Sequence, residues 1–315
     1  MILKDSEILL TEPRGFCAGV ERAIEIVNRA ISIFDENIFV KHEVVHNKFV
    51  IDELIKKGVI FVESLDEVPD ESILIYSAHG VSKEITNTAK LKNLKVFDAT
   101  CPLVTKVHFE IHKYSQENTD VVLIGHNGHP EVEGTMGQYL SQVGKIHLIE
   151  NEKDVEELNI TNDNLAYVTQ TTLSVDDTKN IISCLKEKFP NIKGPRKDDI
   201  CYATQNRQEA VKKILHYCDS LIVVGSQNSS NSQRLKEIAV QHGKKAYLVD
   251  NETQLDINNF ANDKVIGITA GASAPESTVQ SLVKYLLSEG AHMSDKNIIF
   301  KKESVSFSIP KILRT

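Results

Sequence analysis

The sequence lacks two local signatures of cofactor binding. It has no cysteine pair spaced as CxxC, so a zinc ribbon or a thioredoxin-type redox site is not indicated. It also has no glycine-rich loop of the GxGxxG or GxxxxGKS/T type, which excludes the common nucleotide fingerprints. The chain therefore carries no recognisable flavin or nicotinamide motif.

The chain also has no excess of basic residues and no long apolar run. The chain has 36 Lys and Arg against 44 Asp and Glu, a formal charge of −8, so nucleic acid is not an expected partner. No apolar run approaches the ~18 residues that span a bilayer, so we expect no membrane segment. The first residues, MILKDSEILL, do not resemble a signal peptide, and we expect a cytoplasmic protein.

Short apolar runs alternate with amphipathic ones along all 315 residues, a length sufficient for two or three domains. This alternation predicts an α/β fold with mostly parallel sheets. The expected strands are EILLT (7–11), ILIYSA (73–78), LKVFDA (94–99), VVLIG (121–125), LIVVG (221–225) and VIGIT (265–269).

Three of the five cysteines occupy similar places in this pattern. Cys17, Cys101 and Cys201 lie 84 and 100 residues apart, and each precedes an amphipathic helix. The simplest interpretation is three similar α/β units that each offer one thiol at a strand-to-helix turn. Cys184 and Cys218 instead fall within helical apolar patterns and are expected to pack in the core.

A thiol at a helix N-terminus lies near free N–H donors and the positive end of the helix dipole, which favour the thiolate. The alternative is a small buried residue at a tight turn. Three thiolates would suit a soft metal centre. A cubane iron–sulfur cluster normally takes four cysteines, so three would leave one iron open to a substrate oxygen.

Polar residues follow several of the expected strands. Because ligands of α/β sheets bind beyond the C-terminal ends of strands, these loops could line one crevice suited to a phosphate or diphosphate. The residues include His79, His129, Glu131, Glu133, Thr171, Ser229, Ser230, Asn231 and Ser273. Simpler roles are also open: Ser273 with Glu276 fits a capping box, Ser229 or Ser230 could cap a helix, and His46 could be a hydrogen-bonded histidine at the end of an element.

Nine segments then resemble one known family. They are PRGFCAGVERAI, HEVVHN, SAHGVS, FDATCPLVTKVH, GHPEVEGTMGQ, TQTTLSVDDT, GPRKDDICYATQNRQEA, GSQNSSNSQRL and ITAGASAP, in order from about residue 8 to 310. They look like the signature segments of the 4-hydroxy-3-methylbut-2-enyl diphosphate reductases, the LytB family, which catalyse the last step of the non-mevalonate isoprenoid route.

The resemblance implies a specific site. Three α/β units surround a central [4Fe–4S] cluster held by Cys17, Cys101 and Cys201, and the fourth iron takes the substrate hydroxyl. The residues expected around the diphosphate are His46, His79, His129, Ser229, Asn231 and Ser273, with Ser230 beside them in the same loop. Glu131 matches the family's proton-delivering acid and Thr171 the threonine near the hydroxyl. Spacing alone does not separate Glu131 from Glu133, because both would point to one side of an extended loop.

The expected reaction is a two-electron reductive dehydroxylation that yields isopentenyl and dimethylallyl diphosphate. The family resemblance implies ferredoxin or flavodoxin as the one-electron donor. We place the units at residues 18–101, at residues 102–197, and at residues 1–17 with 198–315. Two other classes use the same residue types: a zinc or cysteine hydrolase, and a cluster-bearing sensor without turnover.

Overall fold

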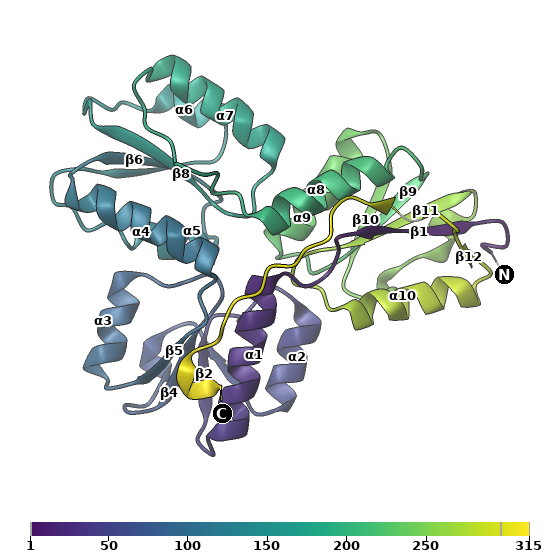
Figure 1. Cartoon of the computed structure of the whole chain (residues 1–315), viewed down its shortest axis with the longest axis horizontal. Helices are drawn as coiled ribbons and strands as arrows, with labels where there is room; N and C mark the ends of the chain where they lie inside the picture. Colours follow the sequence, from purple (N-terminus) through teal and green to yellow (C-terminus); the bar gives the residue numbers. More distant parts are fainter. Residues whose placement is uncertain (1, 297, 315) are drawn as a thin grey trace. The chain divides into compact units, whose positions relative to one another are not determined.

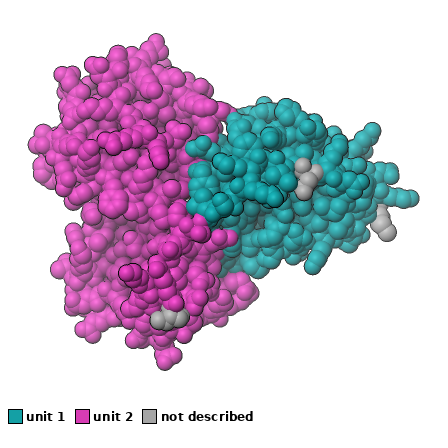
Figure 2. All heavy atoms as spheres, in the orientation of Figure 1, with its two compact units in different colours: residues 1–20, 46–52, 202–305 teal, residues 21–45, 53–201, 306–315 magenta. Residues whose placement is uncertain are grey.

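The computed structural model describes residues 2–296 and 298–314, which divide into two compact units. The first unit comprises residues 1–20, 46–52 and 202–305, and the second comprises residues 21–45, 53–201 and 306–315 (Figure 2). Helices α1 (Ala18–Ile33) and α2 (Lys48–Lys56) contain residues of both units. The unit boundaries expected from the sequence stay a prediction.

The first unit is built on one sheet of parallel strands in the order β10-β9-β11-β1-β12, which Figure 1 labels. Strand β13 also pairs with β1. Its strands are β1 (Glu7–Glu12), β9 (Ser220–Val224), β10 (Lys245–Val249), β11 (Val265–Ala270), β12 (His292–Met293) and β13 (Ile298–Ile299). Its helices are α8 (Tyr202–Ile214), α9 (Ser230–Gln241) and α10 (Glu276–Ser288), with 3-10 turns η2 (Glu252–Gln254) and η3 (Ile257–Phe260).

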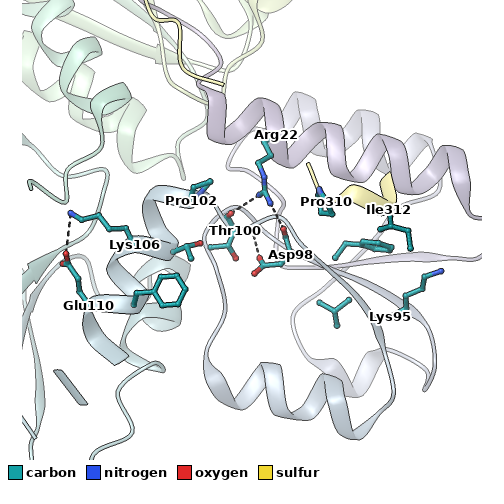
Figure 3. A pocket seen from close by; sticks show the side chains of 13 residues that line it. Arg22, Lys95, Asp98, Thr100, Pro102, Lys106, Glu110, Pro310 and Ile312 are labelled. Atoms are coloured by element: carbon teal, nitrogen blue, oxygen red, sulfur yellow. Dashed lines mark hydrogen bonds and ion pairs between the residues drawn. The ribbon is translucent and has the colours of Figure 1, made fainter. Parts of the chain in front are cut away.

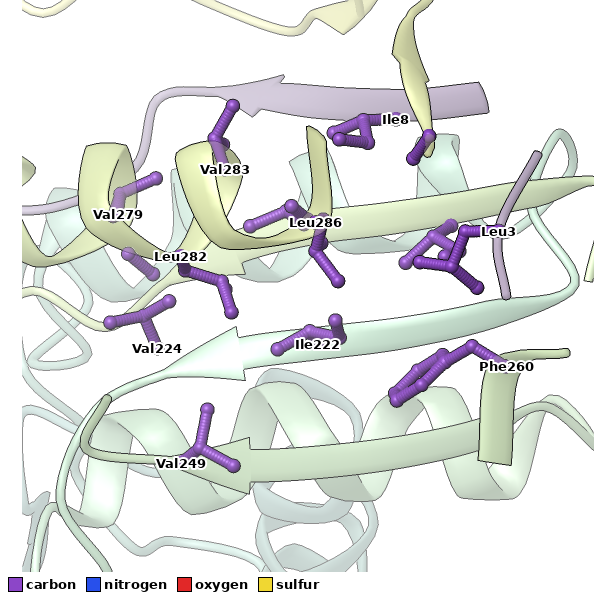
Figure 4. Packing of buried hydrophobic residues seen from close by; sticks show 14 of the residues in the cluster. Leu3, Ile8, Ile222, Val224, Val249, Phe260, Val279, Leu282, Val283 and Leu286 are labelled. Atoms are coloured by element: carbon purple, nitrogen blue, oxygen red, sulfur yellow. The ribbon is translucent and has the colours of Figure 1, made fainter. Parts of the chain in front are cut away.

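Both faces of this sheet are buried, which explains why its strands are almost continuously apolar. On one face Ile8 and Ile222 pack against Leu282 and Leu286 of α10 (Figure 4). The residues that follow in each strand point the other way, and Leu9 packs there against α8 and α9. The two helical layers thus fix the edge of the sheet where β1, β9 and β11 end.

The second unit holds two smaller parallel sheets, ordered β3-β2-β4-β5 and β7-β6-β8. Its strands are β2 (Ile38–Lys41), β3 (Ile60–Val62), β4 (Ile73–Tyr76), β5 (Lys95–Asp98), β6 (Asp120–Ile124), β7 (Ile146–Ile149) and β8 (Leu165–Thr169). Its helices are α3 (Lys83–Leu91), α4 (Pro102–Gln116), α5 (Pro130–Met136), α6 (Glu152–Glu157) and α7 (Val175–Lys188), with 3-10 turns η1 (Leu65–Glu67) and η4 (Lys311–Leu313).

Glycines lie where helix α5 meets the loop after β4, and this contact of Gly80, Gly134 and Gly137 is called the glycine seam below. A Cβ atom added at Gly134 in α5 would lie only 3.2 Å from the carbonyl oxygen of Gly80, in the loop after β4. The backbone N–H of Lys83 donates to Gly137 O at 3.1 Å across the same seam. Larger side chains would push α5 away from this loop, so the glycines set the distance between the residues that the two segments carry.

The α/β fold with mostly parallel sheets is confirmed, and all six expected strands are present within two residues of their predicted ends. Cys184 lies inside α7 as expected. The placement of Cys218 in the helix that follows Cys201 is wrong, because α8 ends at Ile214 and Cys218 lies in the turn before β9. Its side chain is nevertheless buried in the core, as predicted. None of the helices in the described residues combines the length and apolar character that a bilayer crossing requires.

Candidate active site

The three cysteines singled out by the sequence each lie at the start of a helix. Cys17 directly precedes α1, Cys101 is the N-cap of α4 with Pro102 in the first turn, and Cys201 directly precedes α8. All three side chains are partly exposed. The expected position at a helix start is therefore found for all three, but only Cys17 and Cys101 follow a strand, because the element before Cys201 is α7 (Val175–Lys188).

Each cysteine is fixed through its backbone N–H to a loop that follows a strand. Cys17 donates to Ala272 O, Cys101 to Ala78 O and Cys201 to Thr171 O, each at 3.0 Å. Ala272 directly precedes Ser273, and Ala78 directly precedes His79. The third acceptor is Thr171 itself. Every candidate thiol is thus held beside another residue that the sequence places in the site.

The thiols are divided between the units: Cys17 belongs to the first, and Cys101 and Cys201 belong to the second. Among residues 2–296 and 298–314, no three His, Cys, Asp or Glu side chains form a group that could hold a metal ion. The shared metal centre therefore stays a prediction.

Glu131 and Thr171 form a buried pair in the second unit. They follow β6 and β8, which are neighbours in one sheet, so their loops meet at its C-terminal edge. Thr171 donates its backbone N–H to Glu131 Oε1 at 2.6 Å and its hydroxyl to Oε2 at 2.9 Å. Burial raises the pKa of Glu131 to about 7, against the opposing effect of these two hydrogen bonds. The carboxyl group can therefore carry a proton near neutral pH.

The side chains of Glu131 and Glu133 point in different directions, a distinction that the spacing in the sequence could not make. The segment is not extended but helical, within α5, so the two side chains are about 200° apart around the axis. Glu131 is 4% exposed, whereas Glu133 faces outward. Only Glu131 is placed to act inside the protein.

The histidines of the second unit lie close together. The rings of His79 and His129 have centroids 5.8 Å apart and stand nearly perpendicular, at 85°. His129 caps α5, and its Nδ1 accepts the backbone N–H of Glu131 at 3.1 Å. Because Nδ1 acts as an acceptor, a neutral His129 carries its proton on Nε2 and offers it as a donor.

The first unit gathers the other predicted anion-binding residues. Ser229 caps α9 by accepting the N–H of Ser232, so the simpler capping role is real. Ser273 does not form the possible capping box, because Pro275 is the N-cap of α10 and makes no side-chain bond. Instead the Ser273 hydroxyl donates to His46 O at 2.9 Å and joins these two segments. Glu276, the other member of that box, pairs with Arg14.

Asn231 is the clearest candidate for a polar contact with a ligand. Its side chain is 4% exposed, and within the described part of the chain neither its Nδ2 nor its Oδ1 has a hydrogen-bond partner. Buried polar groups are nearly always paired, since an unpaired one costs about 1–3 kcal/mol. An amide left open in the first turn of a helix, beside the Ser229 cap, suits a bound anion.

Arg207 is a residue of the site that the sequence analysis did not identify. Its side chain is fully buried in the first unit, where Nη2 donates to Gly15 O at 2.7 Å and Nη1 to Ala203 O at 2.9 Å. Nη1 also lies 3.2 Å from a carboxylate oxygen of Glu303. Arg207 thereby holds the turn before Cys17, in which Gly15 adopts a positive φ of 68°. Burial raises the pKa of the Cys17 thiol, and the nearby guanidinium opposes that rise.

Comparison with known proteins identifies the family. A profile described as LytB protein matches residues 8–287. The chain belongs to the LytB family. It is 58% identical to the 4-hydroxy-3-methylbut-2-enyl diphosphate reductases of Acinetobacter baylyi and Methylococcus capsulatus, over 98% of this chain and 98% of each relative. The resemblance seen in the sequence is confirmed.

Solved structures of LytB reductases share the fold. The E-1-hydroxy-2-methyl-but-2-enyl-4-diphosphate reductase from Plasmodium falciparum is 43% identical, with a TM-score of 0.93 over 98% of this chain and 97% of that one. A second structure, described as the terminal enzyme of the non-mevalonate pathway, is 30% identical with a TM-score of 0.65, over 90% of this chain and 99% of that one.

The role of Arg207 in this LytB chain can be tested by unfolding. Arg207→Met removes the buried guanidinium from Glu303 and from the carbonyl groups of Gly15 and Ala203, so we expect the free energy of unfolding in urea to fall by about 3–5 kcal/mol. Arg29→Met, which breaks an exposed pair with Glu25, should cost less than about 1 kcal/mol. Equal losses in the two variants would contradict a special role for Arg207.

Proposed function

We propose that this chain reduces 4-hydroxy-3-methylbut-2-enyl diphosphate to isopentenyl and dimethylallyl diphosphate. The allylic C–O bond breaks, two electrons and two protons enter, and the oxygen leaves as water. Family membership supports the reaction class. The observation that carries the proposal is the buried Glu131–Thr171 pair, a carboxyl group that can hold a proton at neutral pH next to the segment that anchors Cys201.

The proposed cofactor is a [4Fe–4S] cluster held by Cys17, Cys101 and Cys201. The donor set fits, because three thiols at helix N-termini are the soft ligands that iron–sulfur clusters take. When bound, the cluster would supply an iron that acts as a Lewis acid toward the substrate hydroxyl and would accept the incoming electrons.

The chain's own residues would bind and orient the diphosphate. In the first unit the proposed ligands are His46, Ser229, Ser230, Asn231 and Ser273, and in the second they are His79 and His129. The open amide of Asn231 and the N-terminus of α9 support an anion there. Neutral His129 would donate from Nε2 while Nδ1 stays bonded to the helix.

Glu131 would deliver a proton, with Thr171 holding its carboxyl group toward the substrate hydroxyl. The donor of electrons is proposed to be ferredoxin or flavodoxin, since the chain has no flavin or nicotinamide motif. The three-unit boundaries and the cytoplasmic location remain part of this proposal. A zinc or cysteine hydrolase would be colourless, and a sensor would be brown but inactive.

Cysteine substitution tests the cluster. Cys17→Ser, Cys101→Ser and Cys201→Ser should each lose most of the bound iron, because serine oxygen is a harder and poorer iron ligand. Cys184→Ser, in the middle of α7, should keep it. The measurement is iron content and visible colour after anaerobic purification. A colourless parent protein, or iron lost only from Cys184→Ser, would contradict the assignment.

Glu131→Gln tests proton delivery, because glutamine keeps the shape but carries no acidic proton. Turnover with a dithionite-reduced dye should fall at least ~100-fold, the lower range for loss of a general acid. Parent turnover should decline as pH rises through about 7, where Glu131 loses its proton, and the variant should lack that decline. Outward-facing Glu133→Gln should remain close to the parent. A Glu131→Gln protein with full iron and within about threefold of parent activity would remove Glu131 from the proton path.

Asn231→Leu should weaken binding of the substrate without lowering the stability of the protein. Removing an unpaired buried amide should leave the unfolding free energy unchanged or raise it by about 1 kcal/mol. Affinity for the substrate diphosphate should fall at least tenfold, since a hydrogen bond to a charged group is worth about 1.5–3 kcal/mol. Asn164→Leu is the control, because it breaks side-chain bonds to Thr119 and Lys193 and should lose stability but not affinity. Unchanged affinity in Asn231→Leu would exclude it from the anion site.

A further inference from the structure

The second unit has an open hollow of about 1020 Å³ that the proposed site does not use. Helix α4, strand β5, Arg22 of α1 and the C-terminal segment around Pro310 line it (Figure 3). Every lining residue belongs to the second unit, so its shape is a property of that unit alone.

Large apolar side chains remain exposed at this hollow. Phe109 is 71% exposed, Ile312 57% and Val96 37%. Single exposed apolar residues are ordinary, but a cluster of them around a concavity, edged by charged side chains, is typical of a protein interaction site.

The charge around the hollow is opposite to that of the whole chain. Its lining has three cations, Arg22, Lys95 and Lys106, against Asp98 and Glu110, and Lys106 is also paired with the buried Asp199 at 2.9 Å, so the positive character comes chiefly from the other basic residues. The adjoining residues 304–314 add Lys311 and Arg314 and contain no Asp or Glu, although the chain carries a formal charge of −8. This face therefore favours an acidic partner.

The hollow also touches the proposed redox site. Thr100 and Pro102 both line it, and Cys101 lies between them in the chain. The Arg22 guanidinium joins this wall to the C-terminal segment, since Nη1 donates to Thr100 O at 3.0 Å and Nε to Ser308 O at 2.9 Å. A partner seated in the hollow would be separated from Cys101 by little more than one residue.

We propose that this hollow is the docking face for an acidic one-electron carrier protein, an inference that rests on the proposed function. Each turnover takes two electrons, so two reduced carriers would dock in succession, and each would leave oxidised by one electron. A small patch of mixed apolar and cationic character suits the weak, short-lived contacts of electron-transfer partners, which bury less than about 1,200 Å².

Charge reversal tests the docking face. Lys95 and Lys311 are exposed and lie outside the proposed catalytic and binding residues, so Lys95→Glu/Lys311→Glu is made as a double variant. With a purified ferredoxin, and separately with a purified flavodoxin, kcat/KM for the reduced carrier at low salt should fall at least tenfold. The deficit should shrink as salt is added, and turnover with the small reduced dye should stay within twofold of the parent.

Two further variants sharpen the result. Lys179→Glu/Lys186→Glu makes the same charge change at exposed positions of α7 and should behave as the parent. Phe109→Ala should weaken the use of either carrier without changing the salt dependence. Equal carrier kinetics in the Lys95/Lys311 and Lys179/Lys186 variants would overturn the docking proposal.

The same experiments separate this proposal from the proposed function. A parent protein with a full cluster that fails to turn over substrate with the dye would contradict the function itself. A parent that works with the dye, and reversal variants that keep full use of the carriers, would contradict only the docking face. Sedimentation that shows a parent dimer, dissociated by Lys95→Glu/Lys311→Glu, would assign the face to a second copy and overturn the carrier proposal.

Discussion

The arrangement of the candidate site depends on one interaction made three times: the backbone N–H of a cysteine donates to the carbonyl of a strand-end loop. Cys17, Cys101 and Cys201 all do so at the same distance of 3.0 Å. The acceptor loops carry Ser273, His79 and Thr171, so the bond that fixes each thiol also fixes a polar residue beside it. For Cys17 and Cys101 parallel strands make this possible, because β1 lies next to β11 and β5 next to β4, and their C-terminal ends open at one edge.

Within the second unit, burial and hydrogen bonding act in opposite directions on the pKa of Glu131. Burial disfavours the charge on Glu131, while the two groups that Thr171 offers favour it, and burial is the stronger effect. The glycine seam between α5 and the loop after β4 sets this helix against His79. The same short helix thus presents Glu131, its His129 cap and the contact with the neighbouring sheet.

The sequence predicted what depends on local pattern. Apolar runs located six strands, because mostly buried strands admit few polar residues; β5 is the exception, with three of its four residues exposed. The cysteines at helix starts were also visible, since the helical period begins directly after each one. The family resemblance supplied the ligand roles, which no pattern in composition or spacing could give.

What the sequence did not predict depends on contacts between distant segments. Arg207 bonds to carbonyl groups near Gly15, 192 residues away, and nothing near it in the chain marks that contact. Ser273 fitted a capping box, yet its hydroxyl bonds to His46, 227 residues away. Glu131 and Glu133 could not be separated until α5 proved to be helical. Cys218 continued a helical period beyond the true end of α8, because a turn before a buried strand can place apolar residues much as a helix does.

The anchoring of the cysteines by main-chain groups has a consequence for how such a site can evolve. An amide N–H belongs to every residue except proline, so the three bonds do not depend on sulfur. The three backbone bonds at residues 17, 101 and 201 are thus independent of the side chains at these positions. Replacement of the three thiols would therefore change the chemistry at these positions while leaving the same three main-chain donors in place.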